Sequence, residues 1–322
     1  MNIGNVFWNL PGEVSGFLNQ AKEHLSGGIL LRQEDPLPFR DAFWDLLCAH
    51  LGCQARVLDW GERTCSPGDF LLKHLFSPRE RAYYFPGDPY GSYIASLKTA
   101  PLLVRVTGVR GSAAAAQWGE LLNDYRRAGG RDLILFVECD ASAGTGALTY
   151  RTDPNVHRYF SIMLSTILRN TPLISYQAEL AANLAPGNPE LCSELLLQGE
   201  QLLLNPADVG RKFGIDEQEA ATAIRQANLV CLYPKIEQLR FDFVRANQDA
   251  ISRCLPLRSM EGELIDNPMD LEIGPLSYLL SHREILRGLP GTEGIHLAAS
   301  VRNKIAHNRP VPYATLLSLD RI

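Results

Sequence analysis

The first half of the chain alternates short apolar segments with helical ones, and this alternation constrains the fold more than any other feature. Segment 112–127 is rich in helix formers, and 36–51 carries apolar side chains at helical spacing. Strands that alternate with helices form βαβ units on a parallel sheet. The sequence therefore predicts an α/β N-terminal domain with a mostly parallel sheet. The expected strands are 28–32, 55–59, 101–107 and 132–138.

From about residue 175 onward the pattern is helical almost throughout. We place an α/β domain at 1–170 and an all-α helical-bundle domain at 171–322, with the boundary between 150 and 190. Segment 77–96 is rich in Pro and Gly, which predicts a long loop or insertion. The expected helices of the second domain are 176–184, 190–204, 206–213, 216–227, 233–254, 276–286 and 294–307.

The charge balance excludes a broad basic surface. The chain has 31 Lys and Arg against 36 Asp and Glu, a net charge of −5, so any contact with RNA must be local. No segment of about 18 uncharged apolar residues occurs, and no basic and apolar leader follows Met1. We expect a cytoplasmic chain with no membrane partner.

The seven cysteines do not form a metal-binding pattern. No pair has Cys-x2-Cys spacing, and the nearest cluster is Cys48, Cys53 and Cys65. Buried free thiols in a reducing compartment are the better interpretation. We expect no metal and no cofactor.

No phosphate loop follows the first expected strand. Gly27 and Gly28 precede that strand, and the turn after it carries Glu34 and Asp35 where phosphate would lie. ATP hydrolysis is therefore not expected. The strand that ends in Glu138 and Asp140 is nevertheless weakly similar to the acidic, magnesium-binding strand of P-loop ATPases. An unrelated three-layer sheet is therefore favoured for the first half, and a degenerate P-loop ATPase-like core, to which it is weakly similar, is the alternative.

Two other motifs have a functional and a structural interpretation. The turn 108–112 joins a strand to a helix N-terminus, where backbone amides and Arg110 favour an anion, but such turns often contain glycine for geometry alone. Segment 208–225 has the outline of a DNA-binding helix-turn-helix. Its second helix begins with acidic residues at 216, 217 and 219, which oppose phosphate, so a structural helical hairpin is favoured.

The most informative motif lies near the C-terminus, where Arg302 and Asn303 precede His307 on one expected helix. Apolar residues at 297, 301 and 305 keep one face of this helix buried, and the helix ends at Asn308 before Pro310. Five residues turn a helix by about 500°, so Arg302 and His307 point about 140° apart.

Residues 230–322 resemble the HEPN domain, a helical bundle whose last long helix carries Arg-x4-6-His, often with a polar residue directly after the arginine. The resemblance implies a metal-independent endoribonuclease. His307 would be the general acid or base, Arg302 would clamp the phosphate, and Asn303 would orient it. Lys304 and Arg309 would add local positive charge for the RNA substrate. In this family the groove is usually composite, so we expect a homodimer through the C-terminal helix.

Two hypotheses follow. The first is a HEPN-like endoribonuclease, a toxin or phage-defence effector whose N-terminal domain senses a trigger or binds a protein partner. The alternative is a non-catalytic interaction or scaffold protein with a degenerate nucleotide-binding fold and a structural HEPN-like bundle. In that alternative Arg302 and Asn303 would be a buried pair tied to Asp270 or Glu272 and would serve only to hold the bundle together.

Overall fold

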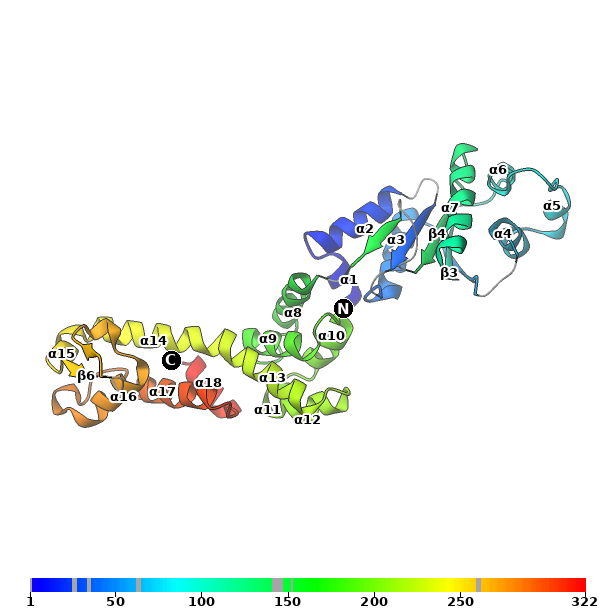
Figure 1. The fold of residues 1–322 in the computed structure, drawn as a ribbon. Helices are drawn as coiled ribbons and strands as arrows, with labels where there is room; N and C mark the ends of the chain where they lie inside the picture. The colour runs from blue at the N-terminus through cyan, green and yellow to red at the C-terminus, as the bar shows by residue number, and fades with distance from the viewer. Residues whose placement is uncertain are drawn as a thin grey trace. The chain divides into compact units, whose positions relative to one another are not determined.

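A computed structural model describes residues 2–24, 28–33, 36–61, 65–140, 147–151, 153–258 and 262–322. The chain divides into two compact units, Met1–Val156 and His157–Ile322 (Figure 1). The N-terminal unit is built on a β-sheet, and the C-terminal unit is built of helices. The two-part fold class predicted from the sequence is therefore confirmed.

The sheet of the N-terminal unit has five parallel strands in the order β2-β3-β4-β1-β5. Four of them coincide with the expected strands, and the fifth, β5, was not predicted from the sequence. The central strand β4 is buried along its whole length, as a strand covered on both faces must be. The strands are β1 (Ile29–Gln33), β2 (Ala55–Asp59), β3 (Leu102–Val109), β4 (Leu133–Cys139) and β5 (Leu148–Tyr150).

Helices cover both faces of this sheet. Alternate residues of β4 point to opposite faces, so Leu135 and Val137 share a core cluster with Trp118 of α7, whereas Phe136 contacts Trp44 of α3. The N-terminal unit is thus a three-layer α/β structure. Its helices are α1 (Ile3–Trp8), α2 (Glu13–Glu23), α3 (Arg40–Leu51), α4 (Pro67–Leu75), α5 (Pro78–Ala82), α6 (Tyr90–Ser96) and α7 (Ser112–Arg127).

The segment 77–96 is not the long loop that its prolines and glycines predicted, because it contains α5 and α6. Pro78 is at the first turn of α5, where its missing N–H costs no hydrogen bond. Ser77 and Glu80 cap the same helix reciprocally. The proline therefore begins a helix here instead of breaking one.

The C-terminal unit is helical, as expected, apart from a small antiparallel pair, β6 (Leu257–Arg258) with β7 (Leu264–Ile265). The expected helix 190–204 is split, because Gly199 has a φ of 59° and starts a new helix. The helices are α8 (Pro154–Leu168), α9 (Ile174–Leu184), α10 (Pro189–Leu197), α11 (Glu200–Leu204), α12 (Pro206–Lys212), α13 (Glu217–Ala227), the π-helical turn η1 (Asn228–Leu232), α14 (Tyr233–Ala246), α15 (Gln248–Ser252), α16 (Ile273–His282), α17 (Thr292–Ala306) and α18 (Tyr313–Asp320).

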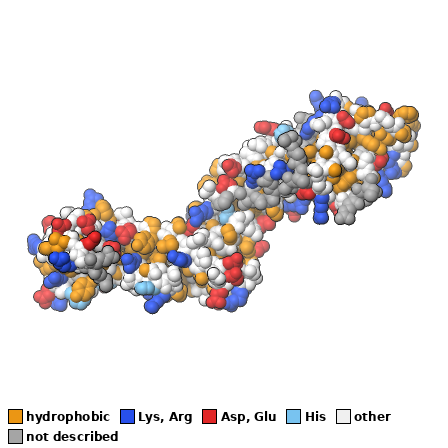
Figure 2. Space-filling model, in the orientation of Figure 1, with side chains coloured by type: hydrophobic (Ala, Val, Ile, Leu, Met, Phe, Trp, Pro, Cys, Tyr) orange, Lys and Arg blue, Asp and Glu red, His pale blue; other side chains and the backbone are white. Residues whose placement is uncertain are grey.

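In the described part of the chain, no helix combines the length and the apolar character needed to cross a membrane. Basic and acidic side chains are interspersed over the face of the molecule shown in Figure 2. This distribution agrees with the near-balanced charge of the sequence.

Candidate functional site

The carboxyl edge of the parallel sheet is the first place to look for a site, because α/β folds bind their ligands there. The turn from β1 to α3 begins this edge, and Glu34 and Asp35 of that turn lie outside the described residues. Pro36 and Pro38 follow, and neither has a backbone N–H to offer a phosphate. The indole Nε1 of Trp8 donates to the carbonyl of Pro38 at 3.0 Å, which holds the turn against α1.

Glu138 and Asp140, at the end of β4, are the two carboxylates that made this strand resemble a magnesium-binding one, and Glu138 is the buried one of the two. Its side chain is only 6% exposed and pairs with two guanidinium groups. Arg105 of β3 donates to Oε1 at 2.5 Å, and Arg40, the first residue of α3, donates to Oε2. Burial lowers the pKa of Arg105, and the nearby Glu138 opposes that change. The carboxylate is therefore already neutralised by the chain itself.

Arg105 is also held from its other side. Its guanidinium carbon lies 4.9 Å from the centroid of the Trp44 ring, in cation–π geometry. This contact and the pairing with Glu138 fix the side chain between β3, β4 and α3. Such a fully engaged group is a structural element of the sheet.

The turn 108–112, the candidate anion site, is filled by another acidic residue of the chain. The backbone N–H of Gly111, at the start of α7, donates to Oδ2 of Asp140 at 2.9 Å. Gly108 has a φ of 77°, and a Cβ there would lie 2.6 Å from Oδ1 of Asp59. Glycine is thus required by geometry, and the helix N-terminus already has an anionic partner.

The second candidate site, which sequence analysis missed, is the aromatic loop, defined as residues 83–90 between α5 and α6. Tyr83 and Phe85 are 71% and 70% exposed. Tyr84 stacks on Tyr90 with ring centroids 4.3 Å apart and planes at 13°. The hydroxyl of Tyr84 donates to the carbonyl of Asp88 at 2.7 Å. The rings of Tyr83 and Phe85 are therefore exposed to solvent. The stacked, partly buried rings of Tyr84 and Tyr90 hold the backbone that carries them.

This loop is also anchored to the neighbouring helices. The hydroxyl of Tyr90 donates to Oδ1 of Asp69 on α4 at 2.6 Å, and that of Tyr93 donates to the carbonyl of Glu80 on α5. Burial and the contact with Asp69 raise the pKa of Tyr90, which stays protonated as a donor. The sequence feature that could have revealed this loop is its density of aromatic residues, with five of them in segment 83–93.

The structure places the five residues of the C-terminal motif on or just after α17. Arg302 lies 3.4 Å from Glu272, one of the two acidic partners considered in the structural alternative. Lys304 donates to Oγ of Ser300 at 3.3 Å. The remaining three, Asn303, His307 and Arg309, are exposed, and His307 caps the C-terminal end of the helix. The functional role of each of the five stays a prediction.

The remaining sequence motifs give no catalytic group. Segment 208–225 forms α12 and α13, and the acidic start of α13 is used in a capping box between Asp216 and Glu219. Burial raises the pKa of Cys48, with Cys53 adding to the effect. Among the described residues, no group of three or more His, Cys, Asp or Glu side chains has the geometry to hold a metal ion.

No protein-family model matches this sequence, and no curated protein does. Among solved structures, the chain is similar to the RuvB Holliday junction branch migration motor of Thermotoga maritima, with 12% identity over 72% of this chain and 76% of that chain and a TM-score of 0.34. A substituted form of the same motor gives 10% identity over 79% of this chain and 89% of that chain, with a TM-score of 0.33. Similarity at this level gives no functional assignment.

The hypothesis of a HEPN-like ribonuclease is wrong. No family model and no curated protein matches the sequence, so no comparison supports a HEPN domain. The helix motif that suggested it is short, and Arg302 pairs with Glu272 in a solvent-exposed ion pair. The predicted endoribonuclease activity and the role as a toxin or antiviral effector are withdrawn with it. RNA as a partner and a homodimer through the C-terminal helix stay untested predictions.

Proposed function

We propose that this is a non-catalytic interaction protein, in which a degenerate nucleotide-binding fold presents a surface for a protein partner. The observation that carries the proposal is the buried pairing of Glu138 with Arg105 and Arg40. A hydrolase needs an unpaired carboxylate to hold magnesium or orient water. Here the corresponding carboxylate stabilises the sheet, and removing it from its two cations would cost free energy.

The backbone at the same edge supports this proposal. A phosphate loop binds its ligand through successive N–H groups, which Pro36 and Pro38 cannot supply. The backbone N–H of Gly111, the N-cap residue of α7, donates to Asp140. The first position thus lacks two of the backbone donors that a phosphate would need, and the second already has an acidic partner.

The aromatic loop is the proposed docking surface. Exposed Tyr and Phe side chains cost free energy in water, and Tyr is enriched among the residues that contribute most to protein interfaces. Stacking of Tyr84 on Tyr90 orders the loop before binding, which lowers the entropy lost on association. Arg79, exposed on the adjacent α5, adds a cation. The partner we propose is a protein with an apolar pocket for Tyr83 and Phe85 and an acidic rim.

The first test measures catalysis. The full chain is incubated with ATP or GTP and magnesium, and phosphate release is followed for the wild type and for Glu138→Gln. We expect no release above the uncatalysed rate from either protein. Turnover by the wild type that the substitution abolishes would overturn the non-catalytic assignment.

The second test measures docking. Partners captured by the full chain in its native cells are purified, and their affinity is measured for the wild type and for the double variant Tyr83→Ala, Phe85→Ala. We expect at least thirtyfold weaker binding, about 2 kcal/mol, from the loss of two central side chains. The matched control replaces Tyr278 and Ile285, exposed apolar residues of the other unit, by alanine. If both double variants bind the partner equally well, the aromatic loop is not the interface.

A further inference from the structure

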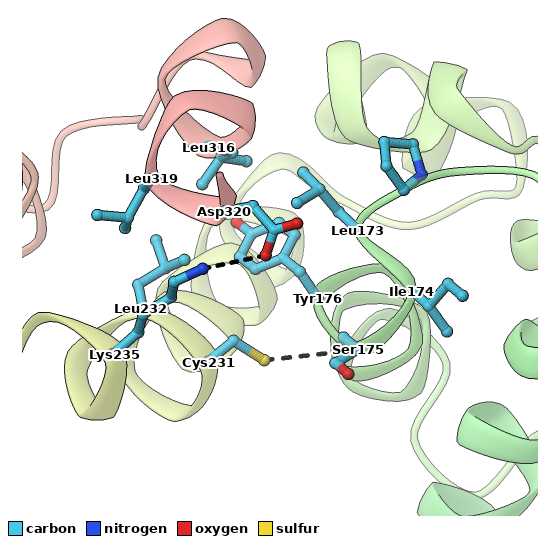
Figure 3. A pocket seen from close by; sticks show the side chains of 11 residues that line it. Leu173, Ile174, Ser175, Tyr176, Cys231, Leu232, Lys235, Leu316, Leu319 and Asp320 are labelled. Atoms are coloured by element: carbon cyan, nitrogen blue, oxygen red, sulfur yellow. Dashed lines mark hydrogen bonds and ion pairs between the residues drawn. The ribbon is translucent and has the colours of Figure 1, made fainter. Parts of the chain in front are cut away.

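A cavity of about 170 Å3 lies within the C-terminal unit, between α9, the π-helical turn η1 with the start of α14, and α18 (Figure 3). Its apolar wall is made of leucine side chains that are themselves buried. Turns of π-helix are rare and often occur at functional sites, and η1 forms part of this wall. The four leucines are Leu173, Leu232, Leu316 and Leu319.

Two opposite charges line the same cavity. Lys235 of α14 and Asp320 of α18 form an ion pair with Nζ and Oδ1 3.2 Å apart. Their side chains are 32% and 49% exposed, in contrast to the buried leucines. The cavity therefore combines an apolar interior with one cation and one anion at its solvent-facing side. Because the pair is partly solvated, separating the two charges for a ligand costs little free energy.

The start of α9 adds a third polar feature. The side chain of its N-cap residue, Leu173, accepts no hydrogen bond from the backbone N–H groups of the first turn. The first turn contains no acidic residue. The first-turn residues 174–176 line the cavity, so the positive end of this helix, 11 residues long, lies at its wall.

Cys231, in η1 beside the start of α14, lines the cavity but adds no charge. The thiol of Cys231 donates to the carbonyl of Ser175 at 3.7 Å. Burial raises the pKa of Cys231 to about 11, so the thiol is neutral at physiological pH. The charge pattern of the cavity is therefore set by Lys235, Asp320 and the start of α9.

We propose that this cavity binds a free α-amino acid with a branched apolar side chain, of the size of valine or leucine. The ligand's carboxylate pairs with Lys235 and the start of α9, its ammonium pairs with Asp320, and its side chain packs among the leucines. Every charge of the ligand and of the cavity then has a partner, as burial of charges requires. A cavity of about 150 Å3 accommodates benzene, so this volume suits a ligand only slightly larger.

This inference goes beyond the proposed function and does not depend on it, because it concerns the other unit of the chain. Binding of a small zwitterion to the C-terminal unit and docking of a protein on the aromatic loop use different residues. Failure of either one leaves the other unaffected.

The test titrates the full chain with L-leucine and L-valine by calorimetry, over micromolar to millimolar concentrations. Two analogues each keep the apolar body and one charge: 4-methylpentanoate has the carboxylate, and isopentylamine has the ammonium. We expect saturable binding of the amino acids and at least tenfold weaker binding of both analogues. Equal binding of either analogue, or no saturable binding of both amino acids, would overturn the proposal.

Variants locate the binding. Lys235→Met and Asp320→Asn each remove one charge and keep the length of the side chain, and each is expected to weaken leucine binding at least tenfold. The control, Asp208→Asn, removes one partner of the exposed ion pair with Arg211 in the same unit and is expected to leave affinity unchanged. Thermal unfolding without ligand checks that all three variants are folded. Unchanged affinity in both Lys235→Met and Asp320→Asn would place any binding outside this cavity.

Discussion

The Nε atom of Arg105 lies 2.5 Å from Oε1 of Glu138, in an ion pair that β3 and β4 bury almost completely. Arg105 is opposite Phe136 in the register of these strands, and Glu138 is two residues further along β4 on the same face. The pair is thus a diagonal cross-strand contact, reinforced by Arg40 from α3. It explains why an acidic strand end here contributes to the stability of the sheet.

Replacing Glu138 by glutamine should destabilise the N-terminal unit by about 3 kcal/mol, because Arg105 would keep its buried charge without a counter-ion. Urea unfolding of the full chain measures the change. The control is Glu284→Gln, which breaks an exposed pair with Arg287 and should change stability by less than about 0.5 kcal/mol. Equal effects of the two substitutions would show that the buried pair has no special role.

Replacing Trp8 by phenylalanine should destabilise the chain by about 2 kcal/mol, since it removes the donor to the buried carbonyl of Pro38 and leaves a small void. The matched variant is Trp118→Phe. Trp118 is equally buried, but within the described residues its Nε1 has no hydrogen-bond partner. We expect a smaller loss for Trp118→Phe in the same unfolding experiment, and the reverse order would contradict the assigned role of Trp8.

Stability should fall as the pH drops below about 6.5, because His157 is buried in its neutral form. Burial lowers the pKa of His157 in the folded state, while backbone groups of Ala182 and Ala185 act in the opposite direction. The unfolded chain therefore binds the proton first. The stabilisation is complete above the unfolded pKa and is lost toward the folded one, by at most about 1.4 kcal/mol per pH unit.

The measurement is the free energy of unfolding between pH 7.5 and 5.5 for the wild type and for His157→Leu. His157→Leu should lack the fall in the free energy of unfolding that protonation of His157 causes in the wild type. His307→Gln, at an exposed histidine of the same unit, should keep it. A decline in His157→Leu as steep as in the wild type would rule out His157 as the source.

Replacing Gly91 by alanine should destabilise the N-terminal unit by about 2 kcal/mol, because the added Cβ would lie 2.5 Å from the backbone N of Tyr125 and force α6 away from α7. Since α6 carries Tyr90 and Tyr93, the order of the aromatic loop should decrease as well. The change in stability is read from urea unfolding, and the change in the loop from the rate of proteolysis within residues 83–90.

The control for this prediction is Gly119→Ala on α7, where the nearest atom to a new Cβ is a flexible Leu30 methyl at 3.4 Å. Alanine inside a helix is favoured over glycine, so this variant should be neutral or more stable by up to about 1 kcal/mol. A neutral Gly91→Ala would show that α6 and α7 can separate without cost.

Local patterns predicted the elements whose signals lie within one segment. The expected strands and the helix 112–127 correspond to β1 to β4 and α7, because their apolar spacing is a local property. The three-residue β5 was missed, since so short a strand has almost no periodicity of its own. Segment 77–96 was predicted to be a loop because a proline in the interior of a helix breaks it. Pro78 instead lies in the first turn of α5, where proline is favoured.

The sequence by itself determined the class of each half: strands alternating with helices, then helices alone, with a near-balanced charge and no phosphate loop. Only the tertiary structure decided the strand order, the pairing of Glu138 with Arg105 and Arg40, and the rigid presentation of Tyr83 and Phe85. The physical reason is distance along the chain. Periodicity arises between residues two to four positions apart, whereas Glu138 meets partners 33 and 98 positions away, which only packing can bring together.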